Sequence, residues 1–142
     1  MLDAPGADGS TYAYGIDGGN VVGRYIDESG DHGFLYDGTS WTILDAPWGG
    51  STSPYGIEGS RIVGYASQQG IGKGFLYDGL TWTTFYKPGA TYTFARDISG
   101  DDIVGDYIDD IGRHGFIYTI PEPATIMLFG LGFIQILHQK IH

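Results

Sequence analysis

A repeat of 41 residues dominates this chain of 142 residues. Four positions recur in three copies at this spacing: Ile16, Ile57 and Ile98; Gly23, Gly64 and Gly105; Phe34, Phe75 and Phe116; Tyr36, Tyr77 and Tyr118. Trp41 and Trp82 make one more step of the same length. Coincidences at a single period indicate a repeated structural unit. We therefore divide the chain into units of about 1–43, 44–85 and 86–120, which form one repeat domain over 1–120, and a tail over 121–142.

Each unit is predicted to form short strands separated by turns. In the first unit we expect strands at 12–16, 21–26, 33–36 and 40–44, with a hairpin turn at Asp37-Gly38. The 25 glycines suit the turns, and the many aromatic residues (11 Tyr, 7 Phe and 3 Trp) suit pleated sheets. The repeat domain shows no helical period. The predicted fold class is therefore all-β, built of four-stranded antiparallel repeats.

The size of the unit leaves two architectures open. About 41 residues in four antiparallel strands is typical of one blade of a β-propeller, and equally of one lobe of a β-trefoil. The third unit lacks its fourth strand, because Pro123 stands where the tryptophan of the other units should recur. Residues 2–5 align after that strand, with 44–47, and do not supply it. We expect eleven strands in a propeller-like partial arc, with a trefoil as the alternative.

Composition excludes several classes of protein. Without cysteine the chain has no disulfide, no thiol enzyme chemistry and no Cys-based zinc site. The net charge is −10, and the repeat domain holds 16 acidic against 6 basic residues. Such a surface repels phosphate backbones, so we expect no nucleic-acid partner. It suits cations and sugars instead.

Charged residues at repeated positions offer only weak candidates for a metal site. His32, Lys73 and His114 are equivalent in the three units, but an ammonium group cannot coordinate a metal, so we interpret this position as structural or solvent-facing. Loops rich in acidic residues contain oxygen ligands of the kind that calcium prefers. They follow no calcium-loop pattern, so a solvated hairpin is the default interpretation. The weak calcium candidates are Asp27, Asp31, Asp109 and Asp110.

Aromatic residues at the repeat period are the candidates for ligand binding. Trp41 and Trp82, with Tyr36 and Tyr77, are expected to pack in the core between neighbouring units, and alternatively to stack on a sugar. No catalytic motif or cofactor-binding motif occurs, so we predict that the protein is not an enzyme and needs no cofactor. The alternative is an extracellular carbohydrate hydrolase that would use clustered carboxylates, such as Asp101, Asp102 and Asp106.

The tail differs from the repeat domain. Pro121-Glu122-Pro123 ends the strands, and the uncharged apolar segment 124–137 follows. As a helix these residues would span about 21 Å, less than the hydrocarbon core of about 30 Å, so a membrane segment and a buried core helix both stay open. The apolar residues assigned to the membrane helix are Ala124, Leu128, Phe129, Leu131, Phe133 and Leu137.

The tail resembles the PEP-CTERM sorting signal, in which Pro-Glu-Pro, an apolar segment and a short basic end close the chain. The resemblance covers 121–142, although Lys140 is the only firm cation at the end. It implies a bacterial protein that an exosortase processes at the membrane. The repeat domain resembles the extracellular HAF repeats, whose pattern matches Gly15-Ile16, Val21-Val22-Gly23 and residues 32–36.

These resemblances imply a location outside the cell or in its envelope, with the tail anchored in the membrane before processing. The first five residues form neither a basic region nor an apolar stretch, so export of this exact chain is doubtful and we expect a fragment of a longer protein. The expected function is surface display, adhesion or binding of matrix polysaccharide. A further alternative is a structural protein that self-associates through its open sheet edges.

Overall fold

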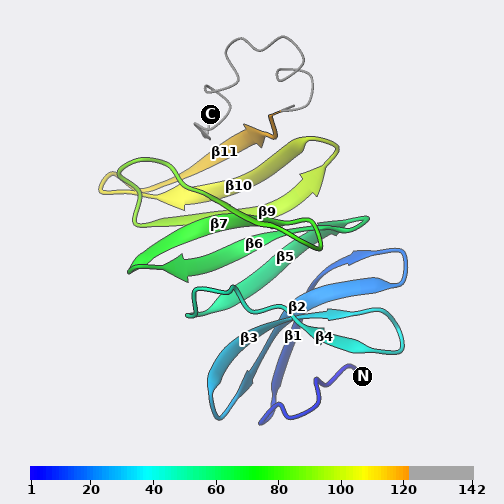
Figure 1. The fold of residues 1–142 in the computed structure, drawn as a ribbon. Coiled ribbons are helices and arrows are strands. Elements are labelled where there is room, and N and C mark those ends of the chain that lie inside the picture. The colour runs from blue at the N-terminus through cyan, green and yellow to red at the C-terminus, as the bar shows by residue number, and fades with distance from the viewer. Residues whose placement is uncertain (122–142) are drawn as a thin grey trace.

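The computed structural model describes residues 1–121, which form eleven strands and no helix (Figure 1). The first unit contains β1 (Ser10–Asp17), β2 (Asn20–Asp27), β3 (Gly30–Tyr36) and β4 (Trp41–Ile43). The second contains β5 (Thr52–Glu58), β6 (Arg61–Gln68), β7 (Ile71–Tyr77) and β8 (Trp82–Phe85). The third contains β9 (Tyr92–Ser99), β10 (Asp102–Ile108) and β11 (Arg113–Thr119). The all-β prediction is confirmed, while the predicted helix at 124–137 lies outside the described residues.

Within each unit the strands follow one another as an antiparallel meander. β1, β2, β3 and β4 pair in this order, and β5, β6, β7 and β8 do the same. The turn after β3 is closed by Asp37, whose Oδ1 accepts hydrogen bonds from the amides of Thr39 and Ser40 at 2.9 and 2.7 Å. Asp78 closes the equivalent turn of the second unit in the same way. The predicted hairpin at Asp37-Gly38 is therefore correct.

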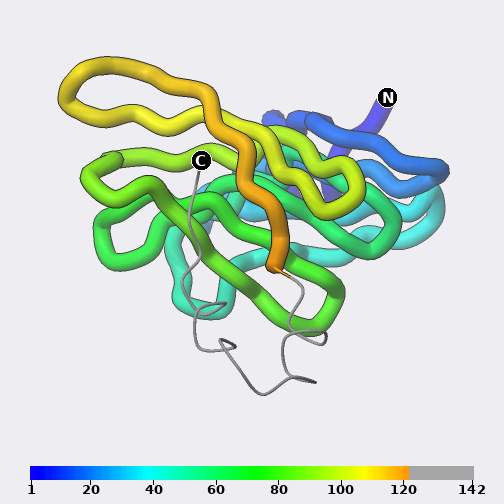
Figure 2. Tube along the Cα trace, turned by 90° about the horizontal axis from the view of Figure 1, so that it is seen from above, coloured from blue at the N-terminus to red at the C-terminus, as the bar shows by residue number. Residues whose placement is uncertain are grey.

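The three units are stacked on one another. Figure 1 shows them in chain order from the N-terminal end upward, and Figure 2 looks along the stack. We call the side of a unit that carries Phe34, Phe75 or Phe116 its front face. The opposite side, with Val22, Val63 or Val104, is its back face. The alternation of side chains along β2, β6 and β10 separates the two faces.

Each internal core joins the back of one unit to the front of the next. Val22 of the first unit packs with Ile57, Ile62 and Phe75 of the second. Val63 of the second unit packs in the same way with residues of the third, namely Ile98, Ile103 and Phe116. β5 lies against β1 and β2, and β9 lies against β5 and β6. The repeated apolar positions are thus explained by two equivalent interfaces.

One pairing departs from the antiparallel expectation. β9 is joined to β7 by a parallel bridge between Gly72 and Tyr92, so the second and third units form one seven-stranded sheet. The amide of Gly72 donates to the carbonyl oxygen of Thr91 at 3.1 Å. Gly72 permits this approach, because a Cβ atom there would lie 2.7 Å from the Tyr92 ring.

Candidate functional site

The four candidate aromatic residues lie in two equivalent pairs, each with a tyrosine on the third strand and a tryptophan on the fourth strand of its unit. The ring centroids of Tyr36 and Trp41 are 4.6 Å apart, and those of Tyr77 and Trp82 are 4.5 Å apart. Both tyrosine hydroxyls donate to a turn carbonyl at 2.9 Å, that of Gly38 or Gly79. The structure therefore brings each tryptophan together with the tyrosine of its own unit, and keeps the two pairs in separate units.

A third tryptophan closes the space beside the second pair. Trp48 packs edge-on against Trp82, with ring centroids 6.0 Å apart, and its Nε1 donates to the carbonyl oxygen of Ser67 at 2.8 Å. Trp48 follows Pro47, whereas the residue after Pro5 in the first unit is Gly6. Sequence reasoning missed Trp48 because it does not recur. One feature of the sequence could have indicated Trp48. Ala66 stands where the first unit has the larger Tyr25, and it leaves room for an indole ring.

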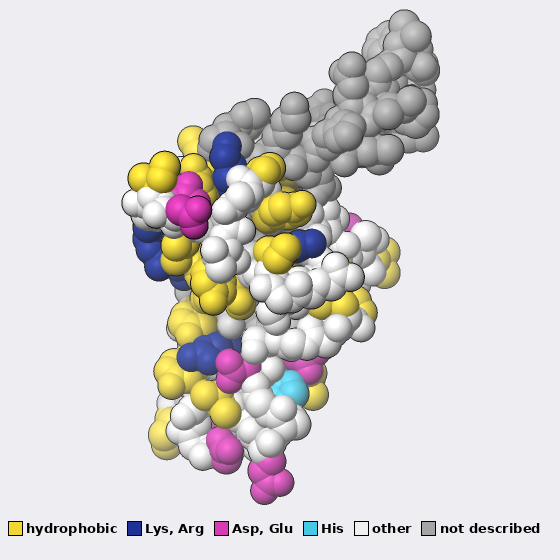
Figure 3. Space-filling model, turned by 90° about the vertical axis from the view of Figure 1, so that its left-hand side faces the viewer, with side chains coloured by type: hydrophobic (Ala, Val, Ile, Leu, Met, Phe, Trp, Pro, Cys, Tyr) yellow, Lys and Arg dark blue, Asp and Glu magenta, His cyan; other side chains and the backbone are white. Residues whose placement is uncertain are grey.

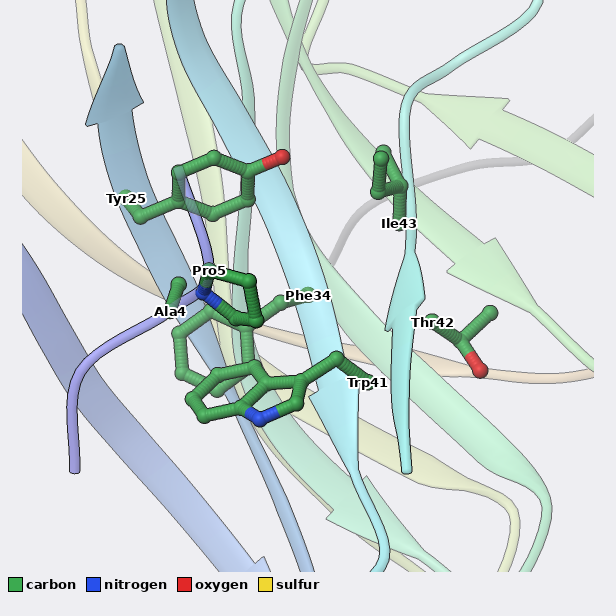
Figure 4. A pocket seen from close by; sticks show the side chains of 7 residues that line it. All are labelled: Ala4, Pro5, Tyr25, Phe34, Trp41, Thr42 and Ile43. Atoms are coloured by element: carbon green, nitrogen blue, oxygen red, sulfur yellow. The ribbon is translucent and has the colours of Figure 1, made fainter. Parts of the chain in front are cut away.

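The equivalent space in the first unit is an open cavity of about 210 Å³ (Figure 4). Trp41, Phe34 and Tyr25 present aromatic surface, and the N-terminal segment crosses the cavity at Ala4 and Pro5. Thr42 and Ile43 complete the lining. Cavities with mostly apolar aromatic walls bind the apolar faces of small molecules, and indole rings serve this role well.

The acidic hairpin loops are engaged with protein groups. Asp27 Oδ1 accepts from the amide and hydroxyl of Ser29 at 2.8 and 2.6 Å, and these hydrogen bonds lower the pKa of Asp27. Asp31 pairs with Arg24 at 3.2 Å. In the third unit Asp109 Oδ1 accepts from the amides of residues 111 and 112 and contacts His114, and the pKa of Asp109 is lowered in turn. Asp110 lies in the same loop between β10 and β11, which is the hairpin expected.

His32 lies between two carboxylates. Its Nδ1 is 2.7 Å from Asp45 Oδ2 and its Nε2 is 3.0 Å from Asp27 Oδ1, while its ring lies against Tyr25. Burial disfavours the charged imidazole, but the hydrogen bonds to Asp45 and then Asp27 outweigh it and raise the pKa of His32. The network ties the β2–β3 hairpin to the segment that leads into the second unit.

In the second unit Lys73 stands at the position of His32 and has different partners. Lys73 Nζ donates to Gln68 Oε1 at 2.9 Å and lies 5.0 Å from the centroid of the Tyr86 ring. Gln68 and Tyr86 are the equivalents of Asp27 and Asp45. The substitutions therefore occur together, which supports a structural role for this position over a metal site.

Two of the carboxylates of the alternative hydrolase lie far apart on one strand. Asp102 and Asp106 are four residues apart on β10, which is about 13 Å along a strand. Glycosidases need their two carboxylates within about 10 Å. Asp106 instead pairs with Arg96 at 2.8 Å and with Arg113, and these pairs outweigh burial and lower its pKa. Asp101 lies 3.7 Å from Arg61.

Side chains of both charges share the surface, although acidic ones are more numerous. On the face drawn in Figure 3, acidic and basic side chains are interspersed among apolar ones. Within residues 1–121, no group of three or more His, Asp or Glu side chains could hold a metal ion. The same part of the chain contains no helix that is long and apolar enough to cross a membrane.

The strand β11 ends at Thr119, and the chain leaves the repeat domain at Pro121. Residues 119–134 match the PEP-CTERM protein-sorting motif. The resemblance found in the tail is thereby confirmed. The PEP-CTERM motif indicates an exosortase-sorted extracellular protein, which is held in the membrane before processing. No curated protein and no solved structure matches the chain.

Of the sorting-motif residues predicted from the sequence, Pro121 is half-buried at the end of the described chain. Glu122 and Pro123 lie outside the described residues. The predicted membrane residues also lie outside the described residues. They are Ala124, Leu128, Phe129, Leu131, Phe133 and Leu137.

Proposed function

We propose that this protein is a non-enzymatic repeat domain that is displayed at the cell surface by its PEP-CTERM tail. One observation carries the proposal: the sorting motif starts at Thr119, the residue at which β11 ends. The repeat domain therefore leads directly into the signal and is the cargo that the signal delivers. Exosortase and the membrane are the partners of the tail, and the repeat domain provides the surface that remains after sorting.

Removal of the tail tests this proposal. The full chain and a chain that ends at Ile120 are given the same N-terminal secretion signal and are expressed in a host with its exosortase and in one without it. We expect the full chain to reach the cell surface only with exosortase, and the shortened chain to be released in both hosts. Equal distribution of both chains would overturn the sorting role.

For the architecture we propose a propeller-like arc of HAF-type repeats. Two features support it: each unit is a meander of about 41 residues, and β5 lies beside both β1 and β9. Within each of the first two units, the first and fourth strands lie at opposite edges of the meander. A propeller builds its blades in this order.

For the ligand we propose a polysaccharide that stacks on Trp41 in the cavity of the first unit. The support is the contrast between the two tryptophan pairs: Trp48 covers Trp82, whereas the space beside Trp41 is open. Stacking of a sugar ring on an indole needs such an uncovered face. The acidic surface favours a neutral polysaccharide over an anionic one.

A matched pair of variants tests the ligand. Trp41→Leu and Trp82→Leu remove the same side chain from equivalent positions, and thermal unfolding of both variants checks that each one folds. On a glycan array we expect the first variant to lose binding and the second to keep it. Loss of binding in both variants, or in neither, contradicts a site at Trp41.

A further inference from the structure

The two ends of the stack expose positions that are buried between units. Ile57 and Ile98 on the front faces of the second and third units are 7% and 4% exposed, but Ile16 of the first unit is 70% exposed. On the back faces Val22 and Val63 are fully buried, but Val104 of the third unit is 43% exposed. Both ends therefore present apolar surface that the internal units bury.

The back of the third unit lacks the glycine on which close packing depends. A Cβ atom on Gly15 would lie 2.6 Å from the carbonyl oxygen of Tyr55, and one on Gly56 would lie 2.9 Å from the Cα atom of Asp97. Real Cβ atoms do not approach backbone so closely, so the following unit can pack only on glycine. The equivalent residue of the third unit is Asp97.

A second contact between units is missing from the same face. Asp17 Oδ2 accepts a hydrogen bond from the amide of Gly59 at 2.7 Å, and Glu58 accepts from the amide of Gly100 at 3.0 Å. Each turn glycine is thus held by a carboxylate of the preceding unit. The third unit has Ser99 where the others have this carboxylate.

The front of the first unit keeps the residues that contact a preceding unit on the internal front faces. Gly18 is the equivalent of Gly59 and Gly100, and Ile16 is the equivalent of Ile57 and Ile98. The segment before β1 also takes the internal path. The amide of Ala4 donates to Thr11 Oγ1 at 3.1 Å, as that of Ala46 donates to Thr52 Oγ1 at 3.0 Å.

We propose that the front face of the first unit docks one more unit of the same repeat, joined to Leu2 as the first unit is joined to Leu44. The docked unit carries glycine and an acidic residue at the positions of Gly15 and Asp17. The back of the third unit is the closed end of the stack. A second copy of the chain docked head to tail does not fit, because it would bring Asp97 against Gly15.

The proposed docking leaves the Trp41 cavity reachable. In the second unit, whose front face already carries a neighbour, Trp48 and Trp82 remain partly exposed. The docked unit would contact Ile16 on β1, at one edge of the sheet of the first unit. Trp41 lies on β4, at the opposite edge of that sheet.

Duplication of the first unit tests the docking proposal in the full chain. Residues 2–43 are repeated once ahead of Leu2, so the new junction runs from Ile43 into residues 2–5, which share their sequence with 44–47. We expect hydrogen exchange at the amide of the original Gly18 to slow by up to roughly tenfold, because this amide gains a hydrogen bond to a carboxylate. We also expect the melting temperature to rise.

The matched control carries the same duplication with Gly15→Asp and Asp17→Ser in the added copy, the residues found in the third unit. It should fold without protecting the original Gly18. Unchanged exchange of Gly18 in the first duplication, or equal protection in both, overturns the proposal. So does a dimer of the unextended chain in light scattering that Ile16→Asp dissociates, because a second copy would then occupy this face.

Discussion

At the scale of single residues, the repeated glycines have two separate causes. Gly18, Gly59 and Gly100 occupy turns with positive φ, as the turn signals of the sequence predict. Gly23, Gly64 and Gly105 lie inside strands instead. A Cβ atom on Gly64 would lie 2.1 Å from the carbonyl oxygen of Ser53, where the first two strands of the unit approach each other at a bulge.

Substitution of a strand glycine should therefore be costly. We expect Gly64→Ala to lower the free energy of unfolding by about 1–3 kcal/mol, because the added methyl group forces the backbone apart. Gly115→Ala is the control: Gly115 also lies in a strand, and its Cβ would have only one neighbour within 4 Å, at 3.8 Å. It should change stability by less than about 0.5 kcal/mol. Equal losses in urea unfolding would contradict this explanation.

His32 makes the stability of the first unit depend on pH. Its pKa is raised in the folded protein above the ordinary value of about 6.5. The folded state therefore binds the proton more tightly, and the resulting stability is complete below the unfolded pKa and is lost as pH rises through the folded pKa.

We expect the unfolding free energy to fall between about pH 5.5 and about pH 8, and His32→Gln to flatten this slope. Lys73→Gln changes the equivalent position of the second unit without removing a histidine, so it should keep the slope of the unmodified protein. Urea unfolding at the two pH values measures the effect. An unaltered slope in His32→Gln would show that the network with Asp27 and Asp45 does not act as described.

At the scale of elements, the sequence predicts the hairpins well and the contacts between units poorly. The strands expected at 12–16, 21–26 and 33–36 lie within β1, β2 and β3, because glycine and aspartate mark the turns and apolar residues alternate between them. The parallel bridge at Gly72 could not be predicted, since no local pattern records which strand of another unit lies alongside. The closed Trp82 site was missed for the same reason, because Trp48 comes from a linker.

The difference between internal and terminal faces gives a test at this scale. Val63 and Val104 are equivalent on the back faces of β6 and β10, yet Val63 is fully buried and Val104 is 43% exposed. Val63→Ala should lower the unfolding free energy by about 1.5–3 kcal/mol, the value of a fully buried apolar side chain. Val104→Ala should lower it by about 0.5 kcal/mol or less. Similar losses for the two variants would contradict the stacking of the third unit on the second.

At the scale of the whole molecule, the two ends of the stack differ, so the stack has a direction. The front face of the first unit is open and exposes Ile16. The back face of the third unit carries Asp97 and Ser99, and the sorting motif begins at Thr119 of this unit. The repeat period and the tail could both be interpreted from sequence, because each is a pattern along the chain. The difference between the two ends could not be predicted from sequence. The effect of Asp97 on docking becomes visible only in the structure, where backbone packs directly against Gly15 and Gly56.

The mass of the mature protein tests the central claim most directly. The chain, supplied with a secretion signal, is purified from whole cultures of hosts with and without exosortase, and its intact mass is measured. We expect a shorter species that retains β11 but has lost residues from the tail, and we expect it only in the host with exosortase. The same full-length mass in both hosts would contradict a repeat domain delivered by its PEP-CTERM motif.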